Sequence, residues 1–302
     1  MLKKGAFFMP IQFAIAPINW SNDDDQTLGG DISLEQCLAE MKQAGFVGCE
    51  LGHKFPKSVE LIKETLKNYN LQATSDWIGT KLTQVEFYDQ TIEDFKIRVD
   101  FLKQLGVKAL KVCECGHSIQ QSNKPIFSTK VEFSPRQWNL LFKGLNHMGQ
   151  IAHDAGLFVA YHQHLGTGVE NKQELNCLMA NTDPELISLL PDTGHLFAAG
   201  IDPLEAFFVY IDRIKYVHLK DVRQHILEES KINNLSFMDA VRAGLFSVPG
   251  DGAINFVPIF ELLQKNNYDG WLVVEAEQDP KKAHPLTYAH KARQFLRDHW
   301  RI

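Results

Sequence analysis

The segment Tyr216–Val222, YVHLKDV, begins with apolar residues and carries a histidine, a lysine and an aspartate at positions 218, 220 and 221. Three other segments have the same form: Tyr161–Gly168 (YHQHLGTG), Leu189–His195 (LLPDTGH) and Trp271–Pro280 (WLVVEAEQDP). Short apolar runs bounded by turn signals are typical of strands buried on both faces, as in a parallel sheet. We therefore predict that all four segments contain parallel strands whose ends carry polar groups.

Strands of this kind alternate with helical segments along the chain. The predicted strands are 11–17, 46–51, 71–77, 107–113, 157–162, 187–190, 214–219 and 271–276. Helical periodicity appears between them, for example over 135–155 after the N-cap residue Ser134. The longer connection 225–254 contains a short helix and a Pro-Gly-Asp-Gly turn. Alternation of eight strands with helices predicts a parallel sheet with helical crossovers.

The length of the chain is compatible with two ordinary domains or one large α/β domain. It has 302 residues, and a barrel of eight β/α units typically needs about 250. Because no break in composition divides the eight units, we predict one (β/α)8 TIM barrel over residues 1–302. The competing doubly wound sheet usually carries a Gly-rich phosphate turn, and neither G-x-G-x-x-G nor a Walker sequence occurs here. Residues 1–10 lack a long apolar core, so we expect a loosely ordered leader rather than a signal peptide.

Composition narrows the class of function. The net charge is −6, from 31 basic and 37 acidic residues, which argues against nucleic acid because its binders usually carry a basic face. No apolar run approaches the roughly 20 residues that span a bilayer, so we expect no membrane partner. Five cysteines, an odd number, fit a reducing cytoplasm better than a disulfide framework. Twelve histidines are the one unusual number.

Ionisable and aromatic side chains gather where the predicted strands end. In a closed β/α barrel the carboxyl ends of the strands form the active site. The candidate site residues are Trp20, Glu50, Trp77, Glu114, His162, His164, Asp192, His195, His218, Lys220, Glu275 and Glu277. Burying such groups is unfavourable unless they are paired or bind a metal, so their placement predicts a functional site.

Several of these residues have a structural alternative. His162 and His164 are two residues apart and so point the same way on a strand, but one of them can be a hydrogen-bonded structural histidine. Asp192 can be a metal ligand or the cap of the next helix. Lys220 can contact a substrate oxygen or be a solvated lysine at a loop start, and Glu277 can form a salt bridge at the barrel mouth.

The mixture of carboxylates and imidazoles predicts a divalent metal. Donor sets of this kind, without thiolates, suit Mn, Co, Zn or Fe(II) better than Ca or a structural zinc. The candidate ligands are far apart in the sequence, and no local motif such as H-E-x-x-H is present. The spacing by itself therefore leaves the ligand set and the metal open.

The sequence resembles the xylose isomerase-like barrels, which include sugar isomerases, epimerases, dehydratases and endonuclease IV. Within them it is similar to the inosose dehydratases, nearly from end to end. The segments that carry the resemblance are APINWSNDD (16–24), LGGD (28–31), ELGHKFP (50–56), YHQHLGTGVE (161–170), LLPDTGH (189–195), HLKDVR (218–223), FSVPGDG (246–252) and VVEAEQDP (273–280). Each segment is short, but their joint order is specific.

The resemblance implies a cytoplasmic lyase of myo-inositol catabolism. Such an enzyme dehydrates 2-keto-myo-inositol (scyllo-inosose), a small polyol ketone, to a trihydroxycyclohexane-1,2-dione. It uses Mn or Co, and glutathione is implied as a further cofactor. Asp192, His218 and Glu275 match the metal ligands of the superfamily. The fourth ligand is a glutamate in sister isomerases, and here it is His162 or His164.

A dehydration of this kind also suggests roles for the remaining candidate residues. We expect proton transfer by His162 or His164 together with Lys220. The expected substrate contacts are Glu50, Glu114 and Glu277 to hydroxyls, Trp20 and Trp77 against the ring, and His195 nearby. Barrels of this size often assemble, so a homo-oligomer is compatible with the sequence.

Three rival functions differ in class. An isomerase or epimerase of a keto-sugar or inosose would use the same metal and enolisation without losing a hydroxyl. An endonuclease IV-like enzyme would need a trinuclear zinc site and a basic groove, which the net charge of −6 disfavours. A non-catalytic binding protein would show no dependence on metal.

Overall fold

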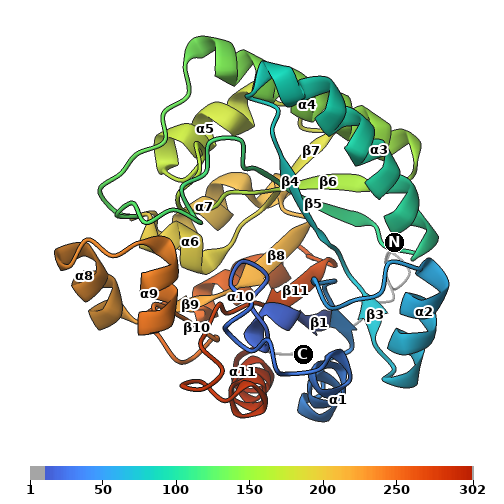
Figure 1. Cartoon of the computed structure of the whole chain (residues 1–302), viewed down its shortest axis with the longest axis vertical. Coiled ribbons are helices and arrows are strands. Elements are labelled where there is room, and N and C mark those ends of the chain that lie inside the picture. The colour runs from blue at the N-terminus through green and yellow to red at the C-terminus, as the bar shows by residue number, and fades with distance from the viewer. Residues whose placement is uncertain (1–10, 301–302) are drawn as a thin grey trace, which may run out of the picture.

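The strands form a closed ring that is surrounded by helices (Figure 1). The computed structural model describes residues 11–300. Strand β1 (Gln12–Ile15) pairs in parallel with both β2 (Gly48–Cys49) and β11 (Trp271–Val274). The other barrel strands are β3 (Gln72–Ala73), β4 (Trp77–Thr80), β5 (Ala109–Glu114), β6 (Phe158–His162), β7 (Ile187–Leu190) and β8 (Tyr216–Leu219).

Pairing continues in sequence order around the ring. One run of paired strands is β3-β2-β1-β11-β8 and the other is β4-β5-β6-β7, all parallel. Isolated parallel bridges, Leu189 to Ile214 and Asp192 to His218, connect the β7 segment to the β8 segment. The predicted (β/α)8 barrel is confirmed. The expected leader, residues 1–10, lies outside the described residues.

The third barrel strand is longer than predicted and changes partner along its length. We expected it to end at Trp77, but β4 continues to Thr80. At the change, the Ser75 hydroxyl donates to the Ala109 carbonyl (2.9 Å) and accepts from the Lys111 amide (3.2 Å), so a side chain replaces a ladder hydrogen bond. Trp77 therefore begins a strand segment instead of ending one.

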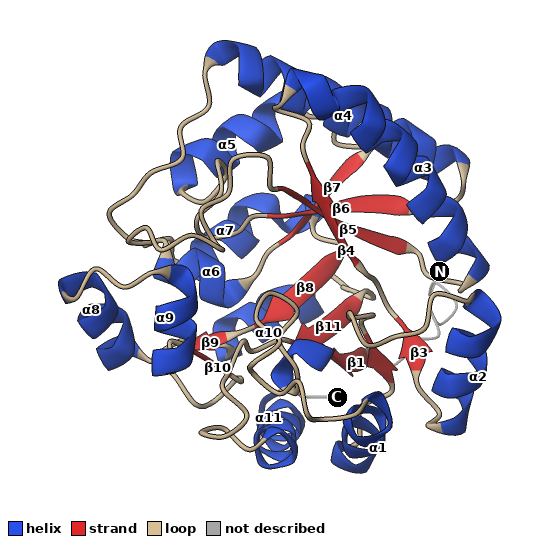
Figure 2. Cartoon of the chain, viewed as in Figure 1, coloured by secondary structure: helices blue, strands red, loops and turns tan. Residues whose placement is uncertain are grey.

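Helices cover the outside of the ring (Figure 2). They are α1 (Leu34–Ala44), α2 (Val59–Asn68), α3 (Tyr88–Gln104), α4 (Pro135–Asp154), α5 (Lys172–Asn181), α6 (Thr193–Ala198), α7 (Pro203–Tyr210), α8 (Gln224–Ile232), α9 (Phe237–Ala243), α10 (Val257–Lys265) and α11 (Pro285–His299). Ser134 caps α4, as predicted, and with Gln137 it forms a reciprocal capping box. None of the helices in residues 11–300 is long and apolar enough to cross a membrane.

The connection from β8 to β11 forms an elaborate loop at the barrel mouth. Before α10, it contains two helices, α8 and α9, where we expected one over residues 225–254, and a short antiparallel pair of β9 (Asp221–Val222) with β10 (Phe246–Ser247). Asp221 accepts backbone hydrogen bonds from Gly250 (3.1 Å), Gly252 (2.9 Å) and Ile254 (3.0 Å). The aspartate of HLKDVR therefore anchors this loop.

The inside of the barrel is narrow and filled mainly by small side chains. One cluster of buried apolar residues consists of Ala14, Ala16, Ala109, Ala160, Leu190, Tyr216 and Val273. The larger core lies between the strands and the helices and contains most of the leucines, isoleucines and phenylalanines. Because small side chains fill the inside of the barrel, longer polar side chains can meet at the carboxyl ends of the strands.

Candidate active site and metal centre

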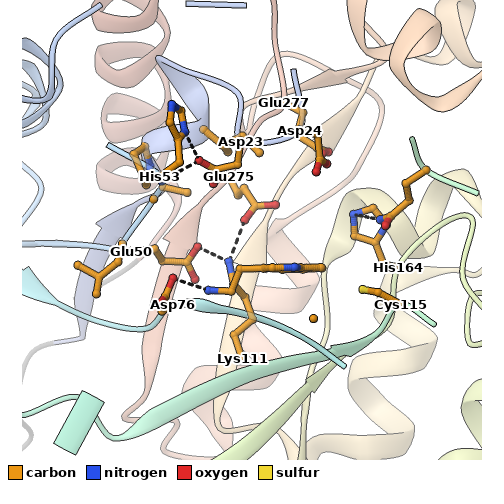
Figure 3. A pocket seen from close by; sticks show the side chains of 18 of the residues that line it. Asp23, Asp24, Glu50, His53, Asp76, Lys111, Cys115, His164, Glu275 and Glu277 are labelled. Carbon is orange, nitrogen blue, oxygen red and sulfur yellow. Dashed lines mark hydrogen bonds and ion pairs between the residues drawn. The ribbon is translucent and has the colours of Figure 1, made fainter. Parts of the chain in front are cut away.

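A cavity of about 600 Å³ opens at the carboxyl ends of the barrel strands. This volume suits a small-molecule ligand. The predicted site residues that line it are Glu50, Trp77, His164, Glu275 and Glu277. Figure 3 shows carboxylates and imidazoles from several strands around one space. The structure thus brings together groups that lie more than 200 residues apart in the chain.

The two histidines that follow Tyr161 have different neighbours. His162, the last residue of β6, lies with Nε2 3.5 Å from Asp192 Oδ2, and neither ring nitrogen makes a hydrogen bond within residues 11–300. Burial lowers the pKa of His162 to about 4, so the ring is neutral at pH 7. The His164 ring instead lies against the Gln120 amide, and its Nδ1 donates to the Leu165 carbonyl (2.9 Å).

Asp192 has one of the two roles that its sequence position left open, that of a helix cap, and the metal-ligand role stays a prediction. Its Oδ1 caps α6 by accepting from the amides of Gly194 (2.9 Å) and His195 (3.0 Å). Its Oδ2 accepts no hydrogen bond in the described chain and lies 3.4 Å from His218 Nδ1. Asp192 Oδ1 therefore caps α6, whereas Oδ2 faces the imidazoles of His162 and His218.

His218 stands between two carboxylates. Its Nε2 lies 2.9 Å from Glu50 Oε1, and its Nδ1 lies 3.1 Å from Glu275 Oε2. Burial disfavours a charged ring, but Glu275 and Glu50 outweigh this and raise the pKa of His218 above its ordinary value. The carboxylates therefore favour positive charge at this position.

Lys220 is enclosed by acceptors. Its Nζ lies 2.8 Å from Glu275 Oε1, 2.9 Å from Glu277 Oε2 and 3.4 Å from Asp192 Oδ2. Burial opposes the charge, but these three carboxylates raise the pKa of Lys220 above its usual value. The side chain is fully buried and is not among the residues that line the cavity. The expected direct contact between Lys220 and a substrate oxygen is therefore corrected.

Glu277 is a cavity carboxylate with an increased affinity for a proton. Burial raises its pKa to about 7, although Lys220 works in the opposite direction. Its neighbour Glu275 has its pKa held low because His218, Lys220 and Lys111 together outweigh the effect of burial. Two carboxylates on one strand end therefore differ in charge near neutral pH.

Two residues that we expected to bind substrate are placed elsewhere. Trp20 is fully buried in the large core, and its Nε1 donates to Glu40 Oε2 (2.6 Å). Glu114 is a loop anchor: it accepts from the Thr80 and Thr83 hydroxyls (both 2.7 Å) and from three backbone amides. Both predictions are corrected, because these side chains turn away from the cavity to satisfy local partners.

His195 lies behind the cavity wall. It is fully buried, its ring centroid is 3.6 Å from that of His164, and its Nε2 lies 3.0 Å from Lys220 Nζ. Phe246 covers another side of the ring, with the centroids 5.0 Å apart. The expected substrate contact of His195 is therefore corrected to packing behind His164.

Sequence reasoning missed Lys111. This lysine lies in the middle of β5, is 5% exposed, and lines the cavity. Its Nζ contacts Glu50 Oε2 at 2.6 Å and lies 3.6 Å from Glu275 Oε2. A signal was available, because Lys111 interrupts the apolar run VKALKVC and shares the inward face of Ala109 two residues earlier.

The mouth of the cavity carries further polar groups that the sequence reasoning did not select. Asp23 Oδ1 lies 2.5 Å from His53 Nδ1, and Asp24 accepts from the Gln121 amide (2.9 Å). All four residues line the cavity. They offer donors and acceptors to a ligand with several hydroxyl groups.

The residues fit a divalent metal. Nε2 of His162 and Nδ1 of His218 are buried atoms without a hydrogen bond in the described chain, and both lie close to Oδ2 of Asp192, which is unpartnered as well. Donor atoms that each lie about 2.1 Å from one ion are roughly 3.0–3.4 Å apart. Asp192 Oδ2 lies 3.5 Å from His162 Nε2 and 3.4 Å from His218 Nδ1, and His218 Nδ1 lies 3.1 Å from Glu275 Oε2.

Three groups of imidazoles and carboxylates in the described chain have donor atoms close enough to share an ion. They are His162, Asp192 and His195; Glu50, His218 and Glu275; and His164, His195 and Glu277. His195 and Glu277 already contact Lys220, and Glu50 contacts Lys111. Asp192 and Glu275 also contact Lys220, but Asp192 Oδ2 makes no hydrogen bond within residues 11–300, and Glu275 reaches Lys220 through Oε1 while its Oε2 lies 3.1 Å from His218 Nδ1. We therefore take His162, Asp192, His218 and Glu275 as the candidate ligand set.

Comparisons with known proteins agree with this geometry. Residues 38–299 match the family model of the xylose isomerase-like TIM barrels. The chain is 48% identical over 289 residues to an inosose dehydratase of Clostridium botulinum (strain Alaska E43 / Type E3), covering 95% of this chain and 97% of that protein. It is 47% identical, with the same coverage, to an inosose dehydratase of Geobacillus thermodenitrificans.

Two solved structures show the same fold at low sequence identity. A D-allulose 3-epimerase from Methylomonas sp. has a TM-score of 0.69 at 18% identity, covering 96% of this chain and 97% of that one. A probable 3-DHS dehydratase from Bacillus anthracis has a TM-score of 0.69 at 13% identity, covering 95% and 99%. The sequence matches, which span nearly the whole chain, lead further: the chain belongs to the inosose dehydratase family of the xylose isomerase-like TIM barrels.

Proposed function

We propose that this protein is a metal-dependent hydro-lyase that removes water from 2-keto-myo-inositol (scyllo-inosose). The product is 3D-(3,5/4)-trihydroxycyclohexane-1,2-dione, an intermediate of myo-inositol catabolism. The observation that carries the proposal is the 48% identity to an inosose dehydratase over 95% of the chain. The polar cavity of about 600 Å³ supports it, since its size and lining suit a polyol ketone.

Asp192, His218, Glu275 and His162 would hold a divalent ion, for which we propose Mn or Co. When bound, such an ion supplies Lewis-acid polarisation of the substrate ketone, which acidifies the adjacent C–H bond. Of the two histidines that the sequence left open, we assign His162 to the metal because its ring nitrogens make no hydrogen bond within residues 11–300 and its Nε2 faces Asp192. Lys111 and Lys220 offset part of the negative charge of the ligand set.

His164 and Glu277 are the groups that we assign to proton transfer, because both line the cavity. Burial lowers the pKa of His164, so its neutral ring can accept the proton from the carbon next to the ketone. Glu277 can give a proton to the hydroxyl that leaves. Lys220 holds Glu275 and Glu277 in place by charge, from a position with no exposed surface.

We assign the binding of the substrate ring to Trp77 and to the polar residues at the mouth of the cavity. Trp77 is 37% exposed and lines the cavity. Its ring packs edge-on against His162 and His164, with centroids 5.6 Å and 5.9 Å apart. A substrate ring that covers Trp77 would therefore lie beside both histidines.

The test uses chelator-treated protein supplied with scyllo-inosose and either Mn²⁺ or Co²⁺. We expect the absorbance of the diketone to appear only after metal is restored. Appearance of a new inosose isomer without diketone would identify an epimerase or isomerase instead. Full turnover without metal would contradict the metal assignment. His153→Ala, at a surface histidine whose side chain is 68% exposed, is the control for histidine loss.

Two further assignments enter the same proposal. Glutathione is tested as an addition to the assay, because only the family resemblance implies it. A cytoplasmic location is proposed from the cysteines, all five of which are free thiols.

A further inference from the structure

The cavity contains a carboxylate whose oxygens are already occupied. Glu50 follows β2 directly and is 1% exposed. Its Oε1 lies 2.9 Å from His218 Nε2 and accepts from the Tyr216 hydroxyl at 3.0 Å, while its Oε2 contacts Lys111 Nζ at 2.6 Å. A side chain with these three partners has little capacity left for a substrate hydroxyl, which is the role that the family resemblance suggested.

We propose that Glu50 is a positioning residue that selects the tautomer and orientation of His218. Of the two ring nitrogens of His218, Nε2 makes a hydrogen bond to Glu50 Oε1 whereas Nδ1 makes none within residues 11–300. A carboxylate only accepts hydrogen bonds, so the proton of a neutral His218 lies on Nε2, toward Glu50. The lone pair is then on Nδ1, which faces Asp192 Oδ2 (3.4 Å) and Glu275 Oε2 (3.1 Å). Glu50 thereby turns the donor atom of His218 toward the other ligands of the metal proposed above, on which this inference rests.

Lys111 and Tyr216 keep Glu50 in this position. Lys111 reaches from β5 and lies between Glu50 and Glu275, 2.6 Å and 3.6 Å from their nearest oxygens. Tyr216 precedes His218 by two residues on β8, so both side chains face the inside of the barrel. Its hydroxyl also lies 2.8 Å from Thr74 Oγ1, which connects the cluster to the third barrel strand.

The contacts distinguish Glu50 from a ligand in its own right. Glu50 is close enough to His218 and Glu275 to share an ion with them. However, a metal on Glu50 Oε1 would have to displace both His218 Nε2 and Tyr216, and one on Oε2 would have to displace Lys111. His218 Nδ1 and Asp192 Oδ2 need no displacement, because neither makes a hydrogen bond within residues 11–300.

The test compares Co²⁺ binding to the full-length protein and to Glu50→Gln. The amide oxygen of glutamine can face Lys111 or His218 but not both, so the preference for one tautomer weakens. Loss of such a partner typically reduces metal affinity about 10–100-fold. We expect the Kd for Co²⁺ to rise in that range, with one ion still bound per chain and the visible absorption spectrum of the saturated protein unchanged in intensity.

The matched control is Glu114→Gln, which removes a charge from a buried glutamate that hydrogen-bonds only local loop groups. Its Kd should stay within about threefold of the wild-type value, which is less than the change that loss of a ligand partner produces. An unchanged Kd in Glu50→Gln would overturn the inference. A spectrum of higher intensity, which reports a lost ligand, would overturn it by making Glu50 a ligand.

A second measurement does not depend on the folding of a variant. In wild-type protein loaded with diamagnetic Zn²⁺, the nitrogen chemical shifts of His218 should show the proton on Nε2 and the metal on Nδ1. The opposite tautomer would overturn the inference while leaving the proposed metal site intact. If the wild-type protein binds no ion at all, the proposed metal site and this inference both fail.

Discussion

The rings of His162 and His164 lie 5.3 Å apart, yet they serve different sides of the site. His162 Nε2 faces Asp192 Oδ2 at 3.5 Å, whereas the His164 ring lies 3.6 Å from His195 and borders the cavity. The alternation of a strand would have placed both on one face, but β6 ends at His162. His164 belongs to the loop after β6, so the alternation of the strand does not fix the direction of its side chain.

Replacing these two histidines separately should therefore give different defects. We expect His162→Ala to weaken Mn²⁺ or Co²⁺ binding by at least about tenfold, because it removes a ligand. We expect His164→Ala to retain the metal and to reduce kcat about 10²–10⁴-fold, because it removes a proton-transfer group. Metal titration and steady-state kinetics of both variants check this. Equal metal affinities in the two variants would contradict the assignment.

Removing the charge of Lys220 should destabilise the protein strongly. Lys220→Met leaves Asp192, Glu275 and Glu277 without their shared cation, and breaking a buried ion pair on one side typically costs about 3–5 kcal/mol. Urea unfolding of chelator-treated protein measures the loss. Added Mn²⁺ should restore part of it, because the ion offsets the same carboxylates.

A matched control for Lys220 is available on the surface. Lys172 pairs with Glu205 at 2.6 Å, but the two side chains are 51% and 46% exposed. Lys172→Met should change stability by only about 0–1 kcal/mol. A Lys220→Met variant that is no less stable than Lys172→Met would show that the buried cluster does not depend on this charge.

Asp251 should make the stability of the protein depend on pH. Burial raises its pKa, but hydrogen bonds from Lys291 and Ser247 and the charge of Arg223 outweigh this and lower it. Because the folded pKa lies below the unfolded one, the contribution is present above about pH 4. It is lost as the pH falls through the folded pKa.

We expect Asp251→Asn to cost about 1–3 kcal/mol at pH 7, as is typical of hydrogen bonds to charged groups. The difference from wild type should shrink as the pH is lowered below about 4, where the unfolded carboxyl takes up its proton. Urea unfolding midpoints at several pH values measure the difference in stability between wild type and Asp251→Asn, and Asp298→Asn, at an exposed position, is the control. A difference that stays constant with pH would rule out the charge as its source.

Trp77 should contribute to substrate binding and to the placement of both histidines. Trp77→Ala opens space beside His162 and His164, so we expect kcat/KM to fall about 10–100-fold, or roughly 1.4–2.7 kcal/mol of transition-state stabilisation. Trp77→Phe should recover part of the loss because a ring remains. Trp138→Phe, in an aromatic group on α4, is the control and should leave kcat/KM unchanged. A Trp77→Ala enzyme with the kcat/KM of the wild type would show that the substrate does not contact this ring.

Several features of the site could be predicted from single segments of the sequence. Asp192, His218 and Glu275 follow or end apolar strands, and the barrel brings strand ends together, so their convergence follows from local pattern and topology. The helix that follows the N-cap residue Ser134 was likewise predicted, because a cap acts within one turn.

Other features required the distances between distant residues. Glu50 and His218 are 168 positions apart, and nothing near either residue indicates that their side chains meet at 2.9 Å. Glu114 sits at a strand end like Glu275, but the loop that follows β4 supplies hydroxyls and amides that bind it away from the cavity. Trp20 is similarly held by a hydrogen bond to Glu40, which is 20 positions away and only partly buried.

By itself, the sequence determined the alternation of strands and helices, and with it the edge of the barrel where the ionisable groups gather. Hydrophobic periodicity and capping are local, so a single chain segment is enough to specify them. Only the tertiary structure decided which oxygen of Asp192 caps α6 and which faces the imidazoles, and that Lys111 reaches Glu50. A buried charge takes its orientation from the partners that satisfy it, and here those partners come from different strands of the barrel.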